Sequence, residues 1–317
     1  MNYTPTLIHS GIDAPKYSLN TDFLKKMENS SDIYFQSIAD ISNEISANIK
    51  DGAIDVPILP SIASKVIMLT NQPDSNAAEL AKLIQSDPPL AAHVMRIANS
   101  AVYSPNSSLV SLQQAIARLG MSLITEIAVS ASLNSKMFYT PGLEKHTATI
   151  WEHGLLTALW AKEISRTTRK NVEATFLCGL LHSIGHPVAL HMSFEISSQK
   201  NILMPEESHL KIAQKFEKPL GISTLQQWSM PEIIVSSIEY FEDYKRAPQF
   251  KEQTATVYAA SLLATESQQN AGVASTDTID KICDDDVWSE LNIYRDEVEK
   301  IISLKADTLA TLHAMES

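Results

Sequence analysis

Two histidines stand on apolar stretches where they could do chemistry. His182 lies in LCGLLHSIGH, which spans residues 177–186, and His153 lies in TIWEHGLLTALW. Imidazole nitrogens are common metal ligands, and a carboxylate beside them would help to hold a metal that activates water. The residue after His182 is Ser183, whose hydroxyl stays protonated near neutral pH and is a poor ligand. The two histidines therefore belong either to a metal site or to a structural polar cluster.

A second histidine pair does not settle the question. His182 and His186 are four residues apart, which would place both rings on one helical face. Gly185 and Pro187 predict, however, that the helix ends near His186. His153 shares an apolar helical stripe with residues three, seven and eleven positions later, so a buried structural histidine is the alternative interpretation.

Composition limits the remaining chemistry. The 317 residues are 44% hydrophobic, which is enough for a buried core, and the two cysteines, Cys178 and Cys283, lack the spacing of a disulfide framework or a zinc knuckle. Cys178 is interpreted as a buried apolar residue. The sequence also lacks a P-loop, a dinucleotide glycine fingerprint and a nucleophile elbow. A reducing cytoplasm is the expected location.

Charge and hydropathy exclude two classes of partner. The formal net charge of −12 would repel a phosphate backbone, and the sequence has no basic stripe, so nucleic acid is not an expected partner. The N-terminus lacks the pattern of a signal peptide, and no run approaches the ~18 apolar residues of a membrane helix. No membrane association is expected.

Apolar spacing predicts helices almost everywhere. Ile38, Ile41, Ile45 and Ile49 place one stripe on a helix from about residue 32 to residue 50, interpreted as part of the protein's core or as a docking arm. Further helices are expected over 151–167, over 173–184, and from residues 231 and 254 onward. With only 9 glycines and no long alternating run, the fold class is all-α.

Capping residues mark several helix ends. Asp87 is expected as an N-cap with Pro88 in the first turn, and Ser111 and Gly120 are expected to begin and end another helix. Near the C-terminus, the carboxylates of residues 284–286 are interpreted as favourable charge at a helix N-terminus rather than a cation site. That expected helix carries an apolar stripe that should dock on the core, made of Val287, Leu291, Val298 and Ile302.

Several motifs together identify a family resemblance. Asp87-Pro88-x-Leu90, Arg96-x-Ala98-Asn99-Ser100, Tyr103 and the segment 111–120 occur in the order and at the distances of the HDOD domain, the HD-related output domain of bacterial signalling proteins. The resemblance covers residues 54–250 and implies an HD-like multi-helix bundle. On this basis, residues 1–53 form an N-terminal helical extension, and residues 251–317 form helices that complete the HD-like half.

The resemblance also implies where a metal would bind. HD phosphohydrolases hold metal through a histidine, a His-Asp pair and a later aspartate; here these positions are similar to His153, His182-Ser183 and Ser261. Both aspartates are thus serines. The later histidine cluster of many relatives corresponds to Tyr240, Phe241 and Glu242, and an Asp-His pair corresponds to the region of Lys218 and Pro219. The expected vestigial metal site therefore consists of His153, His182, Ser183 and Ser261, and it is expected to hold no metal and no cofactor.

The expected function is a non-catalytic bacterial signal-transduction module that acts through contacts with other signalling proteins, and a homodimer is compatible with it. Two alternatives remain open. One is a metal-dependent phosphohydrolase with an unorthodox ligand set, for which Lys162, Arg166 and Arg169 are candidate phosphate-binding cations. The other is a vacated pocket that binds a small molecule, such as a nucleotide, without turnover.

Overall fold

The structure is a computed structural model that describes residues 31–52, 54, 56–70, 72, 74–105, 108–133, 139–270, 272 and 275–316. These residues form helices and turns with no strand among them, which confirms the all-α prediction. The helices of the N-terminal half are α2 (Ser31–Asp51), α3 (Ser61–Thr70), α4 (Ala77–Gln85), α5 (Pro88–Ala98), α6 (Leu112–Leu119), α7 (Met121–Ser132) and α8 (Glu144–Thr168). The others are α9 (Val172–Leu181), α10 (Gly185–Gln199), α11 (Glu206–Gln227), α12 (Glu232–Glu239), η3 (Tyr244–Arg246), α13 (Lys251–Gln269), α14 (Thr276–Cys283), α15 (Asp286–Glu290), α16 (Arg295–Ser303) and α17 (Lys305–Glu316).

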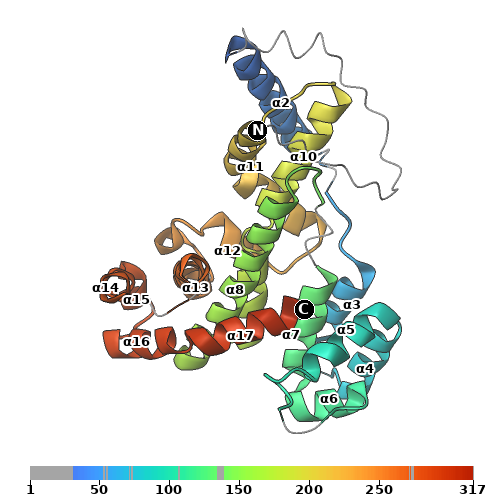
Figure 1. Ribbon diagram of the computed structural model, residues 1–317, viewed down its shortest axis with the longest axis vertical. Coiled ribbons are helices and arrows are strands. Elements are labelled where there is room, and N and C mark those ends of the chain that lie inside the picture. The colour runs from blue at the N-terminus through green and yellow to red at the C-terminus, as the bar shows by residue number, and fades with distance from the viewer. Residues whose placement is uncertain are drawn as a thin grey trace, which may run out of the picture.

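The helices α3 to α7 form a lobe of their own, at the lower right of Figure 1. Its helices begin and end where the capping residues predict. The Asp87 carboxylate accepts a hydrogen bond from the Leu90 N–H at 3.0 Å, and the Ser111 hydroxyl accepts one from the Gln114 N–H at 3.2 Å. Gly120 has a φ of 87°, which suits glycine and separates α6 from α7. This N-terminal lobe therefore owes its turns to residues that local sequence identifies.

The second lobe is built around the long helix α8, which runs through the middle of the molecule (Figure 1). Helix α9 crosses α8 where Gly179 meets Ala158, and a Cβ at Gly179 would lie 2.7 Å from the Ala158 Cα atom. Gly185 likewise allows α10 and α11 to approach, since a Cβ there would lie 1.8 Å from the Glu217 carbonyl oxygen. His182 lies between these two glycines, so both close approaches fix its position.

The helix α2 packs on α10 and α11. Ile41 and Ile45 have no exposed surface, and Glu44 forms an ion pair with Lys200 of α10 at 2.7 Å. The apolar stripe of this helix therefore completes the protein's own core. No helix among the described residues combines the length and apolarity that a bilayer-spanning helix requires.

Two sequence-based predictions of helix boundaries are wrong. The expected helix over 173–184 ends at Leu181, and instead of a helix ending near His186, α10 begins at Gly185 and continues through Pro187. Proline is tolerated there because the first turn of a helix needs no hydrogen bond from its N–H. The single C-terminal helix expected from the apolar stripe is two helices, α15 and α16. They are separated where Asn292 has a φ of 54°.

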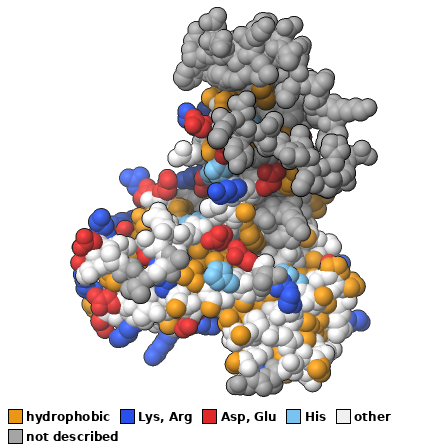
Figure 2. All heavy atoms as spheres, viewed as in Figure 1, with side chains coloured by type: hydrophobic (Ala, Val, Ile, Leu, Met, Phe, Trp, Pro, Cys, Tyr) orange, Lys and Arg blue, Asp and Glu red, His pale blue; other side chains and the backbone are white. Residues whose placement is uncertain are grey.

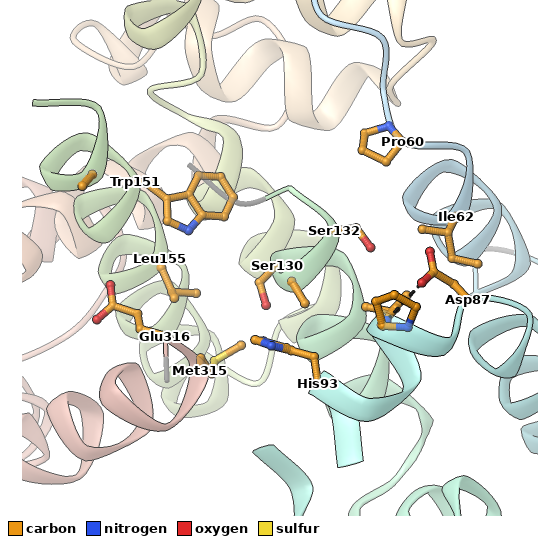
Figure 3. Close-up of a pocket in the computed structure, with 14 residues that line it drawn as sticks. Pro60, Ile62, Asp87, His93, Ser130, Ser132, Trp151, Leu155, Met315 and Glu316 are labelled. Carbon is orange, nitrogen blue, oxygen red and sulfur yellow. Dashed lines mark hydrogen bonds between the residues drawn. The ribbon is translucent and has the colours of Figure 1, made fainter. Parts of the chain in front are cut away.

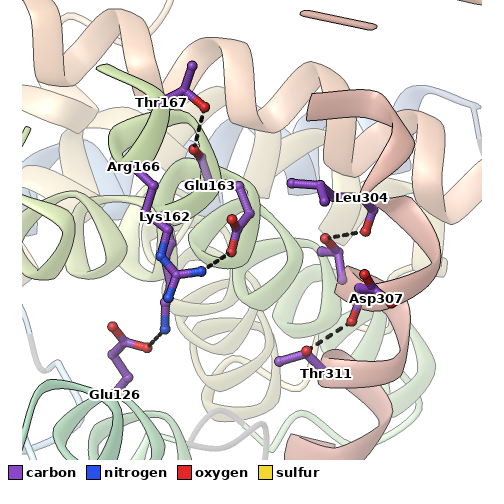
Figure 4. Close-up of polar contacts among 9 residues, drawn as sticks. Glu126, Lys162, Glu163, Arg166, Thr167, Leu304, Asp307 and Thr311 are labelled. Atoms are coloured by element: carbon purple, nitrogen blue, oxygen red, sulfur yellow. Dashed lines mark hydrogen bonds and ion pairs between the residues drawn. The ribbon is translucent and has the colours of Figure 1, made fainter. Parts of the chain in front are cut away.

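The two lobes meet along α7, α8 and α17, and two buried ion pairs lie at or near this junction. Lys162 of α8 donates to the Glu126 carboxylate of α7, and both side chains are buried (Figure 4). Lys305, at the start of α17, donates to the Glu266 carboxylate of α13 at 2.8 Å. The first pair joins the two lobes, and the second anchors α17 to the second lobe.

Candidate functional site

Three helices bring the predicted site residues together. His153 lies on α8, His182 caps the C-terminal end of α9, and Ser261 lies on α13. The Nε2 atom of His153 is 3.1 Å from the Ser261 hydroxyl oxygen, and the ring centroids of His153 and His182 are 5.4 Å apart. These positions, which the family resemblance relates to a metal site, are therefore neighbours in space, although His153 and Ser261 are 108 residues apart in sequence.

Both nitrogens of His153 have hydrogen-bond partners on α13. Besides the contact with Ser261, its Nδ1 atom is 3.1 Å from the Gln268 side-chain oxygen, which can only accept a hydrogen bond, so the ring N–H donates to it. The neutral imidazole is then protonated on Nδ1, and its Nε2 accepts from the Ser261 hydroxyl. Burial lowers the pKa of His153, which favours this neutral form. The ring is satisfied without any ion.

His182 is held as a neutral ring in the core. Its Nδ1 donates a hydrogen bond to the Gly179 carbonyl oxygen at 2.7 Å, and the residue is buried. Burial and the nearby His153 lower the pKa of His182 to about 3. An imidazole that donates through Nδ1 to a backbone carbonyl has its other nitrogen oriented as metal-ligating histidines do. This feature alone retains the geometry of a ligand.

An aromatic row continues from His182 through three further rings to Tyr244. The Phe241 ring lies 5.1 Å from the His182 ring, Tyr258 follows at 5.8 Å from Phe241, and Tyr244 follows at 5.1 Å from Tyr258. These spacings are typical of tilted aromatic contacts. Phe241 belongs to the segment that the family resemblance relates to a histidine cluster. Here that segment places an apolar ring against His182 instead of a ligand.

Ser183 faces a different direction from Ser261. Its hydroxyl lies close to Gly154 of α8, at 3.7 Å from the position that a Cβ of Gly154 would occupy. With Trp151 and Pro187 it lines a small apolar recess. Ser183 thus follows His182 in the chain and faces the helix that carries His153, yet the structure gives it no hydrogen bond with either ring among the described residues.

The donor set does not fit a catalytic divalent metal. Mg²⁺ and Mn²⁺ prefer carboxylate oxygens, and zinc or iron sites use at least three good ligands. This cluster offers two imidazoles, one of them fully engaged in hydrogen bonds, and two neutral hydroxyls. Within the described residues, no three histidine, cysteine, aspartate or glutamate side chains converge on one point suited to a metal.

The remaining candidates lie elsewhere. The Nδ1 atom of His186 is hydrogen-bonded to a Glu217 carboxylate oxygen of α11 at 2.9 Å, so the ring is turned toward α11. Lys162 is paired with Glu126, and Arg166 is paired with Glu163 at 2.6 Å, so these cations serve the lobe junction.

Three further residues have structural surroundings. Burial raises the pKa of the Cys178 thiol to about 12, which makes it unreactive. Asp285 caps α15 by accepting from the Val287 N–H at 2.9 Å, in keeping with the helix-terminus interpretation of the acidic run. Arg169 caps the C-terminal end of α8 with a φ of 57°.

Gln268 is the site residue that sequence reasoning missed. It lies seven positions after Ser261 on α13 and therefore on the same helical face, and its amide also donates to the Thr149 carbonyl oxygen at 3.2 Å. A search for polar residues spaced by seven from Ser261 would have found it. The residue escaped because amides are not usual metal ligands.

The chain belongs to the HDOD domain family, whose pattern matches residues 56–244. An uncharacterised protein of Treponema pallidum (strain Nichols) is 23% identical over 238 residues, which are 70% of this chain and 44% of that protein. This chain therefore spans less than half the length of that relative.

Solved structures show the same fold. An HDOD domain protein of unknown function from Geobacter sulfurreducens is 21% identical and superimposes with a TM-score of 0.64, covering 89% of this chain and 98% of that one. A protein of Shewanella amazonensis SB2B, provisionally named a metal-dependent phosphohydrolase, is 19% identical with a TM-score of 0.66. The match covers 87% of this chain and 99% of that one. At such identities the likeness concerns the fold alone.

Proposed function

We propose that this HDOD protein is a non-catalytic module of bacterial signal transduction that acts through contacts with other proteins. The observation that carries the proposal is the saturated, neutral cluster around His153. Its two ring nitrogens contact Gln268 and Ser261, and neither partner is a carboxylate. A metal would have to displace these hydrogen bonds and would gain no negatively charged ligand in return.

The surroundings of His182 support the same conclusion. The Phe241 ring packs against it, and Tyr258 packs against Phe241. A phosphate could not reach His182 from this side without displacing aromatic rings. A phosphoryl substrate would also need nearby cations. Lys162 and Arg166 are instead bound to Glu126 and Glu163.

The surface of the N-terminal lobe supports a role in protein contacts. Hydrophobic side chains gather over this lobe in Figure 2, and Met68 and Val110 are 63% and 79% exposed. Over the second lobe, acidic and basic side chains are interspersed on the face shown. Clustered exposed apolar residues are more typical of contact surfaces than of a monomer's ordinary exterior.

Metal content tests the loss of catalysis. The purified protein is incubated separately with Mn²⁺, Fe²⁺ and Zn²⁺, desalted, and analysed by mass spectrometry. Because the cluster lacks carboxylates, we expect the wild type to retain less than about a tenth of an equivalent. Retention of one or two equivalents, abolished by changing His153 and His182 to alanine, would favour the metal-dependent phosphohydrolase instead.

A gain-of-ligand variant provides the matched control. Ser183→Asp with Ser261→Asp supplies two carboxylates at the positions that the family resemblance relates to aspartates, and we expect this double variant to retain more metal than the wild type. Ser193→Asp, a substitution beside His209 in another part of the core, tests whether any buried aspartate has this effect. Equal metal content in the two variants would contradict the assignment of the site.

The contact surface is tested separately. Met68→Glu with Val110→Glu places charge on the exposed apolar surface and should leave the melting temperature unchanged, because both side chains point to solvent. Cross-linking in cells of the source organism should then recover fewer partners with this variant than with the wild type. An unchanged set of partners would mean that the N-terminal lobe is not the contact surface.

A further inference from the structure

A cleft of about 600 Å³ lies where the two lobes meet, on the same face of α8 as the ion pair of Lys162 but nearer the start of that helix. One wall comes from α3, α5 and α7 of the N-terminal lobe, and the other comes from α8 and α17. Figure 3 shows Trp151 and Glu316 on the second wall, facing Ile62 and Asp87 on the first. The volume lies in the range of small-molecule sites.

An indole ring dominates the apolar part of the cleft. Trp151 is half-buried, and its ring projects from α8 into the open space (Figure 3). Leu155 and Met315 lie below it, and Leu90 contributes from α5. Such a surface suits a flat or apolar ligand body, and the face of an indole also attracts a cation.

The charged groups of the cleft are acidic. Glu316 stands at its edge, and burial together with the neighbouring Glu152 carboxylate raises the pKa of Glu316. Within the described residues, no lysine or arginine forms an ion pair with Glu152, Glu316 or Asp87. Asp87 uses one carboxylate oxygen to cap α5. Carboxylates that face one another without a cation favour a positively charged ligand.

A buried donor lies on the floor of the cleft. The Arg96 guanidinium donates to the Nδ1 atom of His93 at 2.7 Å, so the neutral ring carries its proton on Nε2. This Nε2 atom is buried against the backbone of Met315, which interacts weakly with the ring; among the described residues it makes no hydrogen bond of good geometry. A weakly bonded buried N–H gains from a better-placed partner, and a ligand with an acceptor could supply one.

We propose that this cleft binds a small organic cation, consisting of an amine or guanidinium head, a flat apolar body and a hydrogen-bond acceptor. The head would lie near Glu316 and Glu152, the body against Trp151, and the acceptor toward His93. Because the cleft is lined by both lobes, such a ligand stabilises their junction and links ligand binding to the relation between the lobes. The inference is independent of whether the His153 cluster is catalytic.

Three related probes test the chemistry. Tyramine has the amine, the ring and a hydroxyl acceptor; tyrosol replaces its amine with an alcohol; phenethylamine lacks the ring hydroxyl. Binding is followed by isothermal titration calorimetry and by the indole N–H resonance that Trp151→Phe removes. We expect tyramine to bind, and tyrosol to bind at least about tenfold more weakly because it cannot pair with the carboxylates. Phenethylamine should fall between them.

Two substitutions locate the site, and one serves as control. Glu316→Gln and Asp87→Asn each remove a charge while keeping size, and asparagine still caps a helix, so both variants should fold. We expect each to weaken tyramine binding by about threefold or more. Asp307→Asn removes a charge from the neighbouring cavity beside Lys162 and should have no effect.

The proposal is wrong if tyramine shows no binding at concentrations up to about 10 mM, if tyrosol binds equally well, or if Asp307→Asn weakens binding as much as Glu316→Gln. These outcomes leave the metal measurements on the His153 cluster unaffected. Conversely, metal retention by the wild type would remove the proposed function without changing the probe results.

Discussion

Helix α8 contributes to two buried polar sites, the His153 cluster and the Lys162 ion pair. The first is neutral and the second is charged. Around His153 every polar contact joins neutral groups, and burial favours uncharged rings on both histidines. Around Lys162, by contrast, a buried ammonium donates directly to the Glu126 carboxylate. Burial raises the pKa of Glu126 more than Lys162 lowers it, so desolvation of this carboxylate opposes the attraction between the two charges.

This difference shows which kinds of buried polar group the fold tolerates. A buried charge is tolerated where a second charge stands opposite it from another helix. At the His153 cluster, an aspartate without a metal would be an unpaired buried charge, whereas a serine needs only one hydrogen bond. The proposed loss of metal binding and the two serines are therefore physically coupled.

The largest expected effect comes from breaking the ion pair. Lys162→Met leaves Glu126 buried without its partner and should lower the free energy of unfolding by about 3–5 kcal/mol, measured by urea denaturation. Adding Glu126→Leu should recover most of this loss, because both charges are then removed together. A single variant that loses less than about 1 kcal/mol would show that Lys162 is solvated in solution.

A smaller effect depends on pH. The pKa of His182 is about 3 in the folded protein and near its ordinary 6.5 when unfolded, so the unfolded chain binds the extra proton between these values. The stability that His182 confers is complete above pH 6.5 and is lost as pH falls toward 3, at about 1.4 kcal/mol per pH unit. When the pH is lowered from 6.5 to 5, the free energy of unfolding should therefore fall by about 2 kcal/mol less in His182→Gln than in the wild type.

The exposed His313 provides the control for this titration. His313→Gln makes the same substitution at an exposed position of α17 and serves as the matched comparison. If His182→Gln and the wild type lose the same stability on acidification, the His182 ring is not held neutral by burial.

The smallest expected effect concerns one hydrogen bond of the cluster. Ser261→Ala removes the hydroxyl that contacts His153 Nε2 and should cost about 0.5–1.5 kcal/mol in thermal or urea unfolding. Thr265→Ala, one turn further along α13 and exposed, changes a hydroxyl of similar type at the surface. Equal losses in the two variants would mean that the contact with His153 contributes nothing of its own.

Local sequence was sufficient for the features that depend on single residues or on fixed motif spacing. The caps at Asp87 and Ser111 follow from side-chain chemistry, and the proximity of His153 and Ser261 follows the motif order of the family. The restart of a helix at Gly185 did not follow from sequence. There the close approach of α11, which only glycine permits, overrides the helix-ending tendency of Gly185 and Pro187.

Features set by packing between distant segments were also beyond sequence reasoning. The contact of Phe241 with His182 depends on how α12 ends over α9, and the acidic cleft depends on α17 reaching the N-terminal lobe. Neither has a local signal. The split of the C-terminal stripe into α15 and α16 likewise turns on the left-handed conformation of Asn292, which an apolar spacing cannot reveal.

The return of α17 to α8 has a consequence for the order of events during synthesis. Roughly 140 residues separate the end of α8 from the start of α17, so the ribosome must make all the intervening helices before Lys305 can meet Glu266. Until then, the apolar side chains of α8 that α17 covers remain exposed to solvent or to a chaperone. The nascent chain therefore passes through a stage in which α7 and α8 are made but α17 is missing from the junction of the lobes, and the docking of α17 is a long-range contact and correspondingly slow.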